Sequence, residues 1–329
     1  MPGPAISVEG LTKSFDDVEA VRGVSFEVAT GEVFGFLGPN GAGKTTTINM
    51  LCTLARPTAG AACVAGHDVV TERDEVRRHI GLVFQDPTLD SYLSAEQNLR
   101  LHAELYGVDR ALLAPRMRMV LEMVGLWERR TSPVSLFSGG MRRRLEIARG
   151  LMHSPRVLFL DEPTIGLDPQ TRRSIWSYIA QLQESEQITI FMTTHYMDEA
   201  EFCDRIAIMD QGEIVALDAP AMLKAKVGAD RIRIETEDDG AAIDALAQRF
   251  GIEARIAEGA VMFAVPSGEH FVPKLFAELG VPIKSVSVAR PTLDDVFMSY
   301  TGTTIRDAEE SQTTPANRSI MQAMAGARR

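Results

Sequence analysis

The chain has 329 residues, 45% of them hydrophobic, which suffices for one large folded domain and a small one. Its formal net charge of −11 excludes the basic footprint that nucleic acid requires, so we expect no nucleic-acid partner. Cys52, Cys63 and Cys203 show neither paired nor CxxC spacing, which favours a reduced, cytoplasmic compartment. We find no signal peptide and no apolar run of the roughly 18 residues that a membrane helix needs. If the protein serves a membrane, we expect it to do so from outside the bilayer.

The N-terminal segment predicts strands that lead into a glycine-rich loop. Residues 6–37 are typical of short strands with turns, and "EVFGFL" (32–37) is predicted to be a buried strand. A helix is predicted over 44–54, because Arg56-Pro57 follows and ends it. This order of buried strand, loop and helix indicates an α/β fold.

Helices are predicted over 86–150, and further strands follow them. Ser94 and Gln97 have the spacing of a capping box, which indicates the start of a helix. "RVLFLDEP" (156–163) and "QITIFMTT" (187–194) are apolar runs bounded by polar residues, typical of parallel strands covered on both faces. We therefore expect a covered parallel sheet with a helical segment inserted before its later strands.

After about residue 220 a new succession of predicted strands and helices begins, which indicates a second domain over 221–302. A strand, a helix, a hairpin with its turn at Glu258-Gly259, a second helix and a last strand follow one another. The order β-α-β-β-α-β is typical of ferredoxin-like α+β folds. A short helix, "LDDVFMSY", closes the domain, and the polar segment 303–329 is expected to be disordered.

The segment "GPNGAGKT" (38–45) fits the pattern GxxxxGK[ST] between a predicted strand and a predicted helix. Glycines allow successive N–H groups to converge on phosphate oxygens, and the helix N-terminus adds positive charge. Lys44 can reach the β- and γ-phosphates, and the Thr45 hydroxyl can bind Mg²⁺. The alternative, a turn that only joins strand to helix, does not require the full motif. The residues assigned to nucleotide binding here are Gly38, Pro39, Asn40, Gly41, Ala42, Gly43, Lys44, Thr45 and Thr46.

Two neighbouring carboxylates follow the apolar run "VLFL". Asp161, at the end of the predicted strand, suits Mg²⁺, directly or through water. Glu162 is then placed to polarise an attacking water. The alternative is an acidic pair that caps a helix before Pro163. Because the same chain carries a phosphate loop, the roles in Mg²⁺ binding and hydrolysis are favoured.

The segment "SLFSGGMRRR" (135–144) places two glycines at the start of a predicted helix. Glycine is a poor helix residue, so something is expected to approach the backbone at Ser138, Gly139 and Gly140. The three arginines 142–144 are interpreted as a solvated face of that helix.

Over residues 5–220 the chain resembles the ATP-binding subunits of ABC transporters. The motifs that carry the resemblance, in family order, are the phosphate loop at 38–45, Gln85 in "QDPTLD", "FSGGM" at 137–141, "LFLDEP" with Glu162, "GLDP" at 166–169 and "TTH" ending at His195. The resemblance implies a P-loop NTPase cassette with an N-terminal antiparallel β-subdomain and a helical subdomain at about 86–150. A small C-terminal α+β domain is added here. ATP and Mg²⁺ are the implied cofactors.

The same resemblance implies individual roles. Gln85 would contact Mg²⁺ and the water, His195 would contact the γ-phosphate, and Asp168 would reach across a dimer interface. Phe15 matches the position of an aromatic ring that stacks on adenine, although a residue of the β-subdomain core is the alternative. The other histidines, His67, His79, His102, His153 and His270, are interpreted as structural.

"FSGGM" is similar to the family's signature segment, LSGGQ. The resemblance implies that Ser138, Gly139 and Gly140 bind the γ-phosphate of an ATP held by the opposite subunit, so we expect a homodimer with two ATP sites. A bulky side chain at either glycine would block that approach. Phe137 and Met141 depart from the family pattern, and the methionine removes any polar contact from its position.

A closer resemblance rests on "SGGMRRRLEIARGL" and "RPTLDDVF", which are similar to the daunorubicin/doxorubicin-resistance class of these subunits. It implies ATP hydrolysis that powers export of a drug or antibiotic through a separately encoded integral-membrane permease, from the cytoplasmic face. The permease is expected to contact the segment from Gln85 to Gly107, where Leu89, Tyr92 and Leu93 are apolar.

The main alternative is a soluble ABC-type ATPase that acts on nucleic acid or ribosomes. DNA-repair relatives carry a long coiled coil between phosphate loop and signature, whereas the segment from Gly38 to Ser138 lacks sustained heptads. Translation-factor relatives carry two cassettes, and this chain has one. A nucleotide-binding regulator without turnover conflicts with the presence of Glu162 and His195.

Overall fold

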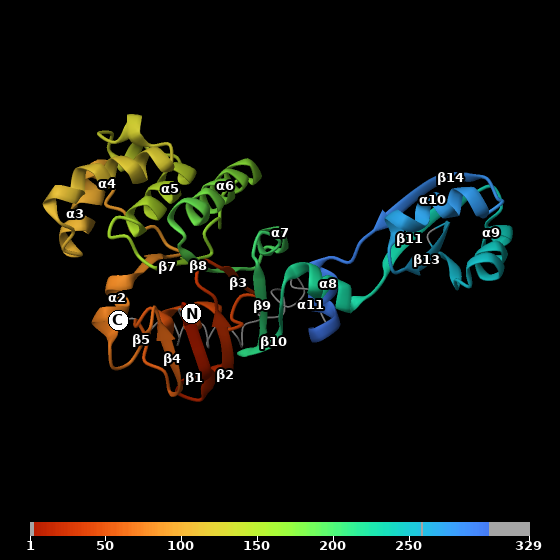
Figure 1. The fold of residues 1–329 in the computed structure, drawn as a ribbon, viewed down its shortest axis with the longest axis horizontal. Coiled ribbons are helices and arrows are strands. Elements are labelled where there is room, and N and C mark those ends of the chain that lie inside the picture. Colours follow the sequence, from red (N-terminus) through yellow and green to blue (C-terminus); the bar gives the residue numbers. More distant parts are fainter. Residues whose placement is uncertain (1–2, 258, 303–329) are drawn as a thin grey trace. The chain divides into compact units, whose positions relative to one another are not determined.

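A computed structural model describes residues 3–257 and 259–302 of the chain (Figure 1). The contacts between residues divide it into two units, with the boundary between Ala219 and Pro220. The segment 303–329, expected to be disordered, lies outside the described residues. Within the described ranges, no helix has both the length and the apolar character that crossing a bilayer requires.

The first unit is built on a six-stranded sheet in the order β10-β9-β3-β8-β7-β6. Its strands are β3 (Val33–Leu37), β6 (Ile80–Val83), β7 (Val157–Asp161), β8 (Thr189–Thr194), β9 (Arg205–Asp210) and β10 (Glu213–Asp218). Neighbouring strands are parallel except for β9 and β10. Strands β3, β7 and β8 are buried along their whole length, as predicted for strands covered on both faces. Their carboxyl ends share one edge, where Gly38, Glu162 and His195 follow them.

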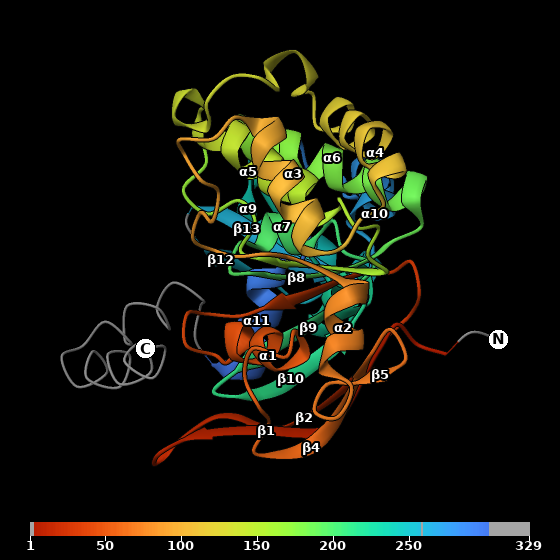
Figure 2. The same cartoon turned by 90° about the vertical axis from the view of Figure 1, so that its left-hand side faces the viewer.

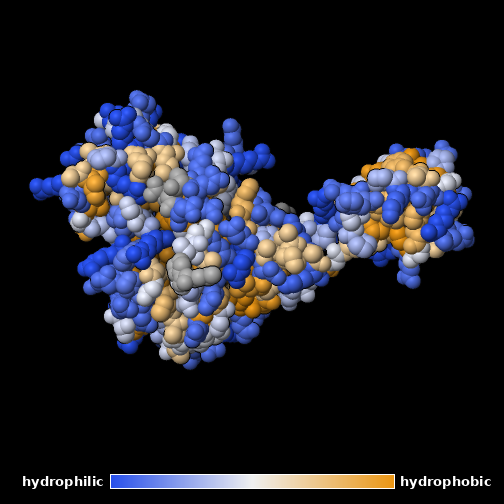
Figure 3. All heavy atoms as spheres, in the orientation of Figure 1, coloured by the Kyte–Doolittle hydropathy of each residue, from blue (hydrophilic) through white to orange (hydrophobic). Residues whose placement is uncertain are grey.

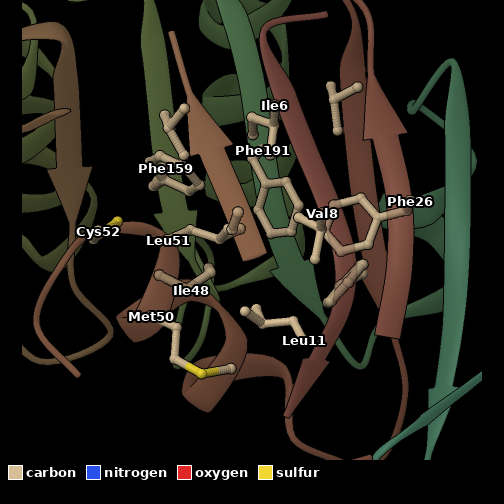
Figure 4. Close-up of a cluster of buried hydrophobic side chains, with 14 of the residues drawn as sticks. Ile6, Val8, Leu11, Phe26, Ile48, Met50, Leu51, Cys52, Phe159 and Phe191 are labelled. Atoms are coloured by element: carbon tan, nitrogen blue, oxygen red, sulfur yellow. The ribbon is translucent and has the colours of Figure 1, made fainter. Parts of the chain in front are cut away.

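A second, antiparallel sheet has the order β2-β1-β4-β5. It contains β1 (Ile6–Phe15), β2 (Val18–Val28), β4 (Ala59–Val64) and β5 (His67–Asp68). Ile6, Val8 and Leu11 of β1 and Phe26 of β2 belong to a hydrophobic core that also includes residues of helix α1 (Lys44–Leu51) (Figure 4). The Phe26 ring stacks on Phe34 of β3 with centroids 5.5 Å apart. The two sheets therefore share one core, which fixes the strand that leads into the phosphate loop.

Helices surround the six-stranded sheet and form the inserted segment. They are α1 (Lys44–Leu51), α2 (Arg73–His79), α3 (Ala95–Leu105), α4 (Arg110–Met123), α5 (Gly139–Gly150), α6 (Pro169–Glu186) and α7 (Met197–Ala200), with 3₁₀ turns at Trp127–Arg129 and Val134–Leu136. Helices α3, α4 and α5 lie together (Figure 2). The predicted capping box is present, since Gln97 N–H donates to Ser94 Oγ at 3.2 Å and Ser94 N–H to Gln97 Oε1 at 2.8 Å.

The second unit has the element order β-α-β-β-α-β that the sequence predicts. Its elements are α8 (Pro220–Val227), β11 (Asp230–Thr236), α9 (Asp239–Ala245), a π-helical turn (Leu246–Phe250), β12 (Ala254–Ala257), β13 (Ala260–Val265), α10 (Gly268–Glu278), β14 (Ile283–Ala289) and α11 (Leu293–Thr301). The strands form an antiparallel sheet in the order β12-β13-β11-β14. Ile232, Ile234, Leu246 and Leu275 are fully buried in a core of this unit. The unit thus has its own hydrophobic core.

Candidate active site

The loop between β3 and α1 is packed so tightly that two of its glycines are required by the fold itself. A Cβ atom at Gly38 would lie 2.2 Å from the carbonyl oxygen of Met209. Gly43 has a φ of 106°, and a Cβ atom there would lie 2.5 Å from the Ala20 carbonyl oxygen. The backbone of the loop therefore runs so close to β9 and β2 that no side chain fits at these two positions. The first N–H groups of α1 have no partner within the helix and can bind an anion.

Lys44 begins α1 and is buried, with 4% of its surface exposed. Its ammonium group donates hydrogen bonds to the carbonyl oxygens of Gly38, at 2.7 Å, and Pro39, at 2.9 Å. The same nitrogen lies 3.8 Å from Glu162 Oε1. The positive charge of Lys44 is therefore held where the loop meets the carboxylate that follows β7.

Asp161, the last residue of β7, receives two hydroxyl hydrogen bonds on Oδ1. Thr193 Oγ1 donates at 2.6 Å and Thr45 Oγ1 donates at 3.2 Å. Burial raises the pKa of Asp161, helped by the negative charge of Glu162 and opposed by the two hydroxyl groups. A buried carboxylate beside a hydroxyl group is an oxygen donor set that suits Mg²⁺, and the cation would supply the charge that burial disfavours.

Glu162 adopts a left-handed backbone conformation, with a φ of 45°, which is uncommon for a residue other than glycine. Its N–H group donates to Thr193 Oγ1 at 3.1 Å. Its carboxylate, 6% exposed, lies 3.3 Å from His195 Nδ1 through Oε1 and accepts from Gln85 Nε2 at 3.5 Å through Oε2. This backbone turn directs the Glu162 side chain toward Lys44, Gln85 and His195.

The charge state of Glu162 suits a proton acceptor. Burial raises its pKa, but the His195 ring and the positive charge of Lys44 outweigh that effect, so the net shift is downward. The approach of His195 Nδ1 is close but poorly aligned for a hydrogen bond. Glu162 is therefore ionised at neutral pH and able to accept a proton.

The structure joins six of the predicted site residues by direct contacts: Lys44, Thr45, Gln85, Asp161, Glu162 and His195.

The signature segment forms a second group of predicted site residues. Ser138 caps α5, since Met141 N–H donates to its Oγ at 3.2 Å, and the hydroxyl hydrogen remains for another acceptor. An added Cβ atom at Gly140 would lie 2.4 Å from Thr171 Cγ2, whereas one at Gly139 would meet Leu167 at an ordinary 3.4 Å. Gly140 is thus required inside the subunit, independently of any phosphate.

Asp168 belongs to this second group. It caps α6 by accepting hydrogen bonds from the N–H groups of Gln170, at 3.1 Å, and Thr171, at 3.0 Å. Thr171 Oγ1 donates to Asp168 Oδ2 at 2.6 Å. Ser138 and Gly139 are exposed, as is Asp168. The signature segment and the Asp168 loop form one continuous exposed surface.

Phe15 stands at the end of β1 with its side chain half-buried. The ammonium group of Lys13 lies 4.7 Å from the centre of its ring. The ring is therefore not part of the buried core, and stacking on adenine stays a prediction for it.

The interpretation of residues 142–144 as a solvated helix face is wrong. Arg143 is only 7% exposed, and its guanidinium group donates to the carbonyl oxygens of Pro163, at 2.6 Å, Asp161, at 3.0 Å, and Glu162, at 3.2 Å. The other arginines are half-buried: Arg142 donates to Phe137 O at 2.6 Å, and Arg144 donates to Val124 O at 2.8 Å. Each arginine of the run therefore has a structural partner.

Arg143 also reaches the loop that carries Gln85. Its Nη1 donates to Phe84 O at 2.5 Å and to Glu146 Oε2 at 2.9 Å, and Glu146 Oε1 accepts from Thr88 N–H at 2.9 Å. Arg143 thereby links α5 to the end of β7 and to the segment around Gln85. Helical spacing gives a signal for this burial, because Arg143 lies four residues before the buried Ile147 on one helix face.

The sequence reading also missed Glu199, a buried carboxylate in α7 with 2% exposure. It accepts hydrogen bonds from Thr164 Oγ1 and from Thr194 Oγ1, the latter at 2.6 Å. Burial raises its pKa despite these bonds. Glu199 connects the segment after Glu162 to the strand end before His195. Its partner Thr164 is remote in sequence, so no local pattern indicates the contact.

Comparisons with known proteins agree with this geometry. A family model described as "ABC transporter" matches residues 21–165, and one described as "ATP-binding protein DrrA1-3-like, C-terminal domain" matches residues 219–301. The linearmycin resistance ATP-binding protein LnrL of Bacillus subtilis is 38% identical over 312 residues, which is 92% of this chain and 100% of LnrL. The daunorubicin resistance ATP-binding protein DrrA3 of Streptomyces coeruleorubidus is 40% identical over 310 residues, which is 92% of this chain and 97% of DrrA3.

Among solved structures, cbiO1 from Clostridium perfringens, part of the ABC transporter complex cbiONQ, matches with a TM-score of 0.64. Its sequence identity is 29%, and the match covers 68% of this chain and 92% of cbiO1. The fold and the phosphate-loop site therefore define an ATPase of the ABC cassette class, as the predicted fold class stated.

The chain belongs to the family of ABC transporter ATP-binding proteins with a DrrA-like C-terminal domain. ATP hydrolysis coupled to transport is the general activity of these subunits, which work with membrane permeases and dimerise. The resemblances to ABC ATP-binding subunits and to the daunorubicin/doxorubicin-resistance class are confirmed, and the alternative of an ATPase acting on nucleic acid is set aside.

Proposed function

We propose that this ATPase powers export of a drug-like or antibiotic-like small molecule through a separately encoded integral-membrane permease. The observation that carries the proposal is the connected group around Glu162, which contacts Lys44, Gln85 and His195 at the carboxyl edge of one sheet. The names of the relatives, which refer to linearmycin and daunorubicin resistance, support the class of substrate.

Each side chain of the group has a task in ATP hydrolysis. Lys44 and the backbone N–H groups of residues 38–46, apart from Pro39, which has none, hold the phosphates. The Phe15 ring stacks on adenine, which contributes about 1–3 kcal/mol. Thr45, Asp161 and Gln85 hold Mg²⁺, which when bound neutralises charge on the phosphate oxygens. Glu162 accepts a proton from the attacking water.

His195 keeps the Glu162 carboxylate in place and contacts the γ-phosphate. Its ring nitrogen Nδ1 already lies 3.3 Å from Glu162 Oε1. A hydrogen-bonding group that touches both the base and the phosphate orders the geometry of the attack, so the water and the phosphorus are held in line.

Two chains complete each ATP site together. The exposed Ser138 hydroxyl group and the N–H groups of Gly139 and Gly140, at the N-terminus of α5, bind the γ-phosphate of the ATP held by the second chain. Asp168 reaches the same interface, because the signature segment packs on the loop that carries it. The functional form is therefore a homodimer with two ATP sites.

Docking of the permease is supported by large apolar side chains that are exposed on the helical segment. Tyr92 is 91% exposed and Leu105 is 76% exposed, whereas Leu89 and Leu93, also expected at this surface, are half-buried. Hydrophobic residues also reach the surface of the C-terminal unit, where Ile256 is 57% exposed (Figure 3). Patches of this kind mark contact surfaces, so we place the subunit peripherally at the cytoplasmic face of the membrane.

The experiment that tests this function expresses the chain with its cognate permease in a drug-sensitive host. The pair should lower the intracellular accumulation of at least one antibiotic-like compound in a panel, and the pair with Glu162→Gln should not. Membrane fractionation of both pairs serves as the control for assembly. Export is contradicted if the wild-type chain is membrane-bound and hydrolyses ATP, yet the accumulation of every compound stays unchanged.

A further inference from the structure

Three potential metal ligands gather at the edge of the antiparallel sheet, away from the hydrolysis site. His67 lies in β5, and Glu75 and His79 lie one helical turn apart in α2. One ligand atom from each side chain lies within 4.8 Å of the others, and all three residues are half-buried. The two imidazole rings face each other, with centroids 5.1 Å apart and planes 20° apart.

Hydrogen bonds fix which nitrogen of each ring is available. His67 Nδ1 lies 3.2 Å from Glu72 Oε1, and His79 Nδ1 lies 2.8 Å from the carbonyl oxygen of Glu75. A carboxylate and a carbonyl oxygen can only accept, so Nδ1 carries the proton in both rings and Nε2 keeps its lone pair. Histidines that bind metals have this arrangement, with the second nitrogen bonded to a carboxylate or a backbone carbonyl.

The surrounding charges favour a cation. Asp68 N–H donates to Glu72 Oε2 at 3.0 Å, and this bond holds the Glu72 carboxylate beside the His67 ring. Glu75 Oε1 accepts from Arg78 Nη1 at 2.5 Å, but both side chains are more than 40% exposed, so the pair is weak and Arg78 can move away. His79 ends α2, where the helix dipole attracts positive charge.

We propose that His67, Glu75 and His79 bind one Zn²⁺ ion, with water as the fourth ligand. Two imidazole nitrogens and one carboxylate oxygen suit Zn²⁺, whereas Mg²⁺ prefers oxygen ligands alone. Zinc bonds of about 2.0–2.1 Å in tetrahedral geometry require ligand atoms roughly 3.4 Å apart, so atoms that lie within 4.8 Å of one another must approach by at most about 1.4 Å. One ring must also turn, because the lone pairs of two nearly parallel rings do not point at the same ion. The ion ties β5 to the last turn of α2, directly before β6, the strand that leads to Gln85.

The test titrates Zn²⁺ into the full chain after treatment with a chelator, using calorimetry with excess Mg²⁺ present to occupy oxygen-only sites. One ion should bind per chain, and the midpoint of thermal unfolding should rise by about 2–6 °C. His67→Ala and His79→Gln should each weaken binding by at least about tenfold and remove the thermal shift, and Glu72→Gln should weaken it by about 10-fold.

Matched controls are His270→Ala, which removes a histidine of the other unit, and Cys63→Ser, which removes a half-buried thiol on the neighbouring strand. Both should bind Zn²⁺ as the wild type does. Circular dichroism in chelator checks that every variant is folded, and His67 offers a second test if the His79 variant is not. The site is overturned if Zn²⁺ binds no more tightly than about 100 µM, or if folded His67 and His79 variants bind like the wild type.

Discussion

Replacing Arg143 by methionine should separate ATP hydrolysis from ATP binding. The guanidinium group donates to the backbone carbonyls of Asp161 and Glu162 and to Phe84 O, next to Gln85. Its acceptors lie around the two catalytic carboxylates, on Glu146 and next to Gln85, and none of these five belongs to the phosphate loop. Methionine matches the aliphatic part of the arginine side chain but has no donor, so it loosens the two catalytic segments and leaves the phosphate loop intact.

The size of the effect follows from burial. Glu146 is 2% exposed and loses its cation in this variant. Removing one partner of a buried ion pair costs about 3–5 kcal/mol, which lowers the unfolding midpoint by roughly 6–20 °C. Total stability is about 5–15 kcal/mol, so the variant should remain folded at low temperature. A shift of about 1 Å in a reacting group lowers the rate by up to about 100-fold, so we expect kcat to fall by about 10–100-fold.

The assay compares kcat with the ATP dissociation constant below the unfolding transition. Affinity for ATP should stay within about threefold of the wild type, because the phosphate contacts are unchanged. Arg143→Lys keeps the charge but not the forked donor geometry and should give an intermediate kcat. Arg144→Met is the matched control, since Arg144 donates to Val124 O, away from the catalytic carbonyls, and should keep its kcat. The reasoning is refuted if Arg143→Met keeps both its kcat and its melting temperature, or loses ATP binding in proportion to kcat.

Further variants test the other assignments. Glu162→Gln should bind MgATP and form an ATP-locked dimer by gel filtration with slow turnover; near-normal turnover would remove Glu162 from the role of base. Lys44→Ala and Ser138→Arg chains, each carrying Glu162→Gln, should trap no labelled ATP alone but up to one per heterodimer when mixed; heterodimers that trap none would contradict sites shared between chains. Burial raises the pKa of Asp161, so ionisation of this carboxyl group costs the Mg²⁺-free fold stability progressively from the unfolded pKa upward, and in full above the folded pKa. Asp161→Asn should therefore raise the melting temperature by a few degrees at about pH 8, less at about pH 4, near the unfolded pKa, and abolish hydrolysis; a lower melting temperature than the wild type at about pH 8 would argue against this. Deleting 221–329 should leave ATP binding intact, and a folded cassette unable to bind ATP would count against a separate C-terminal unit.

Much of the architecture could be predicted because its signals are local. Strands β3, β7 and β8 are continuous apolar runs, and their ends place the phosphate loop, Asp161 and Glu162 at one edge. The capping box before α3 needs only residues three apart. In these cases the residues that determine the strand or the helix start are neighbours in the sequence, so the sequence alone is enough to predict the element.

The rest depends on contacts between distant segments. Arg143 stands between two other arginines. Three consecutive charges favour a solvated helix face, and the prediction followed that charge and not the helical spacing, which places Arg143 on the buried face. Its partners at Phe84 and Pro163 are 59 and 20 residues away. Buried Glu199 likewise accepts a hydrogen bond from the hydroxyl group of Thr164, which lies 35 residues away in the sequence. From the sequence alone, a charged residue of this kind is predicted to be exposed. Its burial can be recognised only when the distant segment that packs against it is known.

The contact between Gly140 and Thr171 sets a rule for how related sequences can vary. A methyl group at Gly140 needs space that Thr171 Cγ2 occupies, and turning the threonine would break its hydrogen bond to Asp168. Relatives that carry alanine at the position of Gly140 should therefore carry glycine or alanine at that of Thr171. Alanine at the position of Gly140 should therefore be rare in any relative that keeps threonine at that of Thr171.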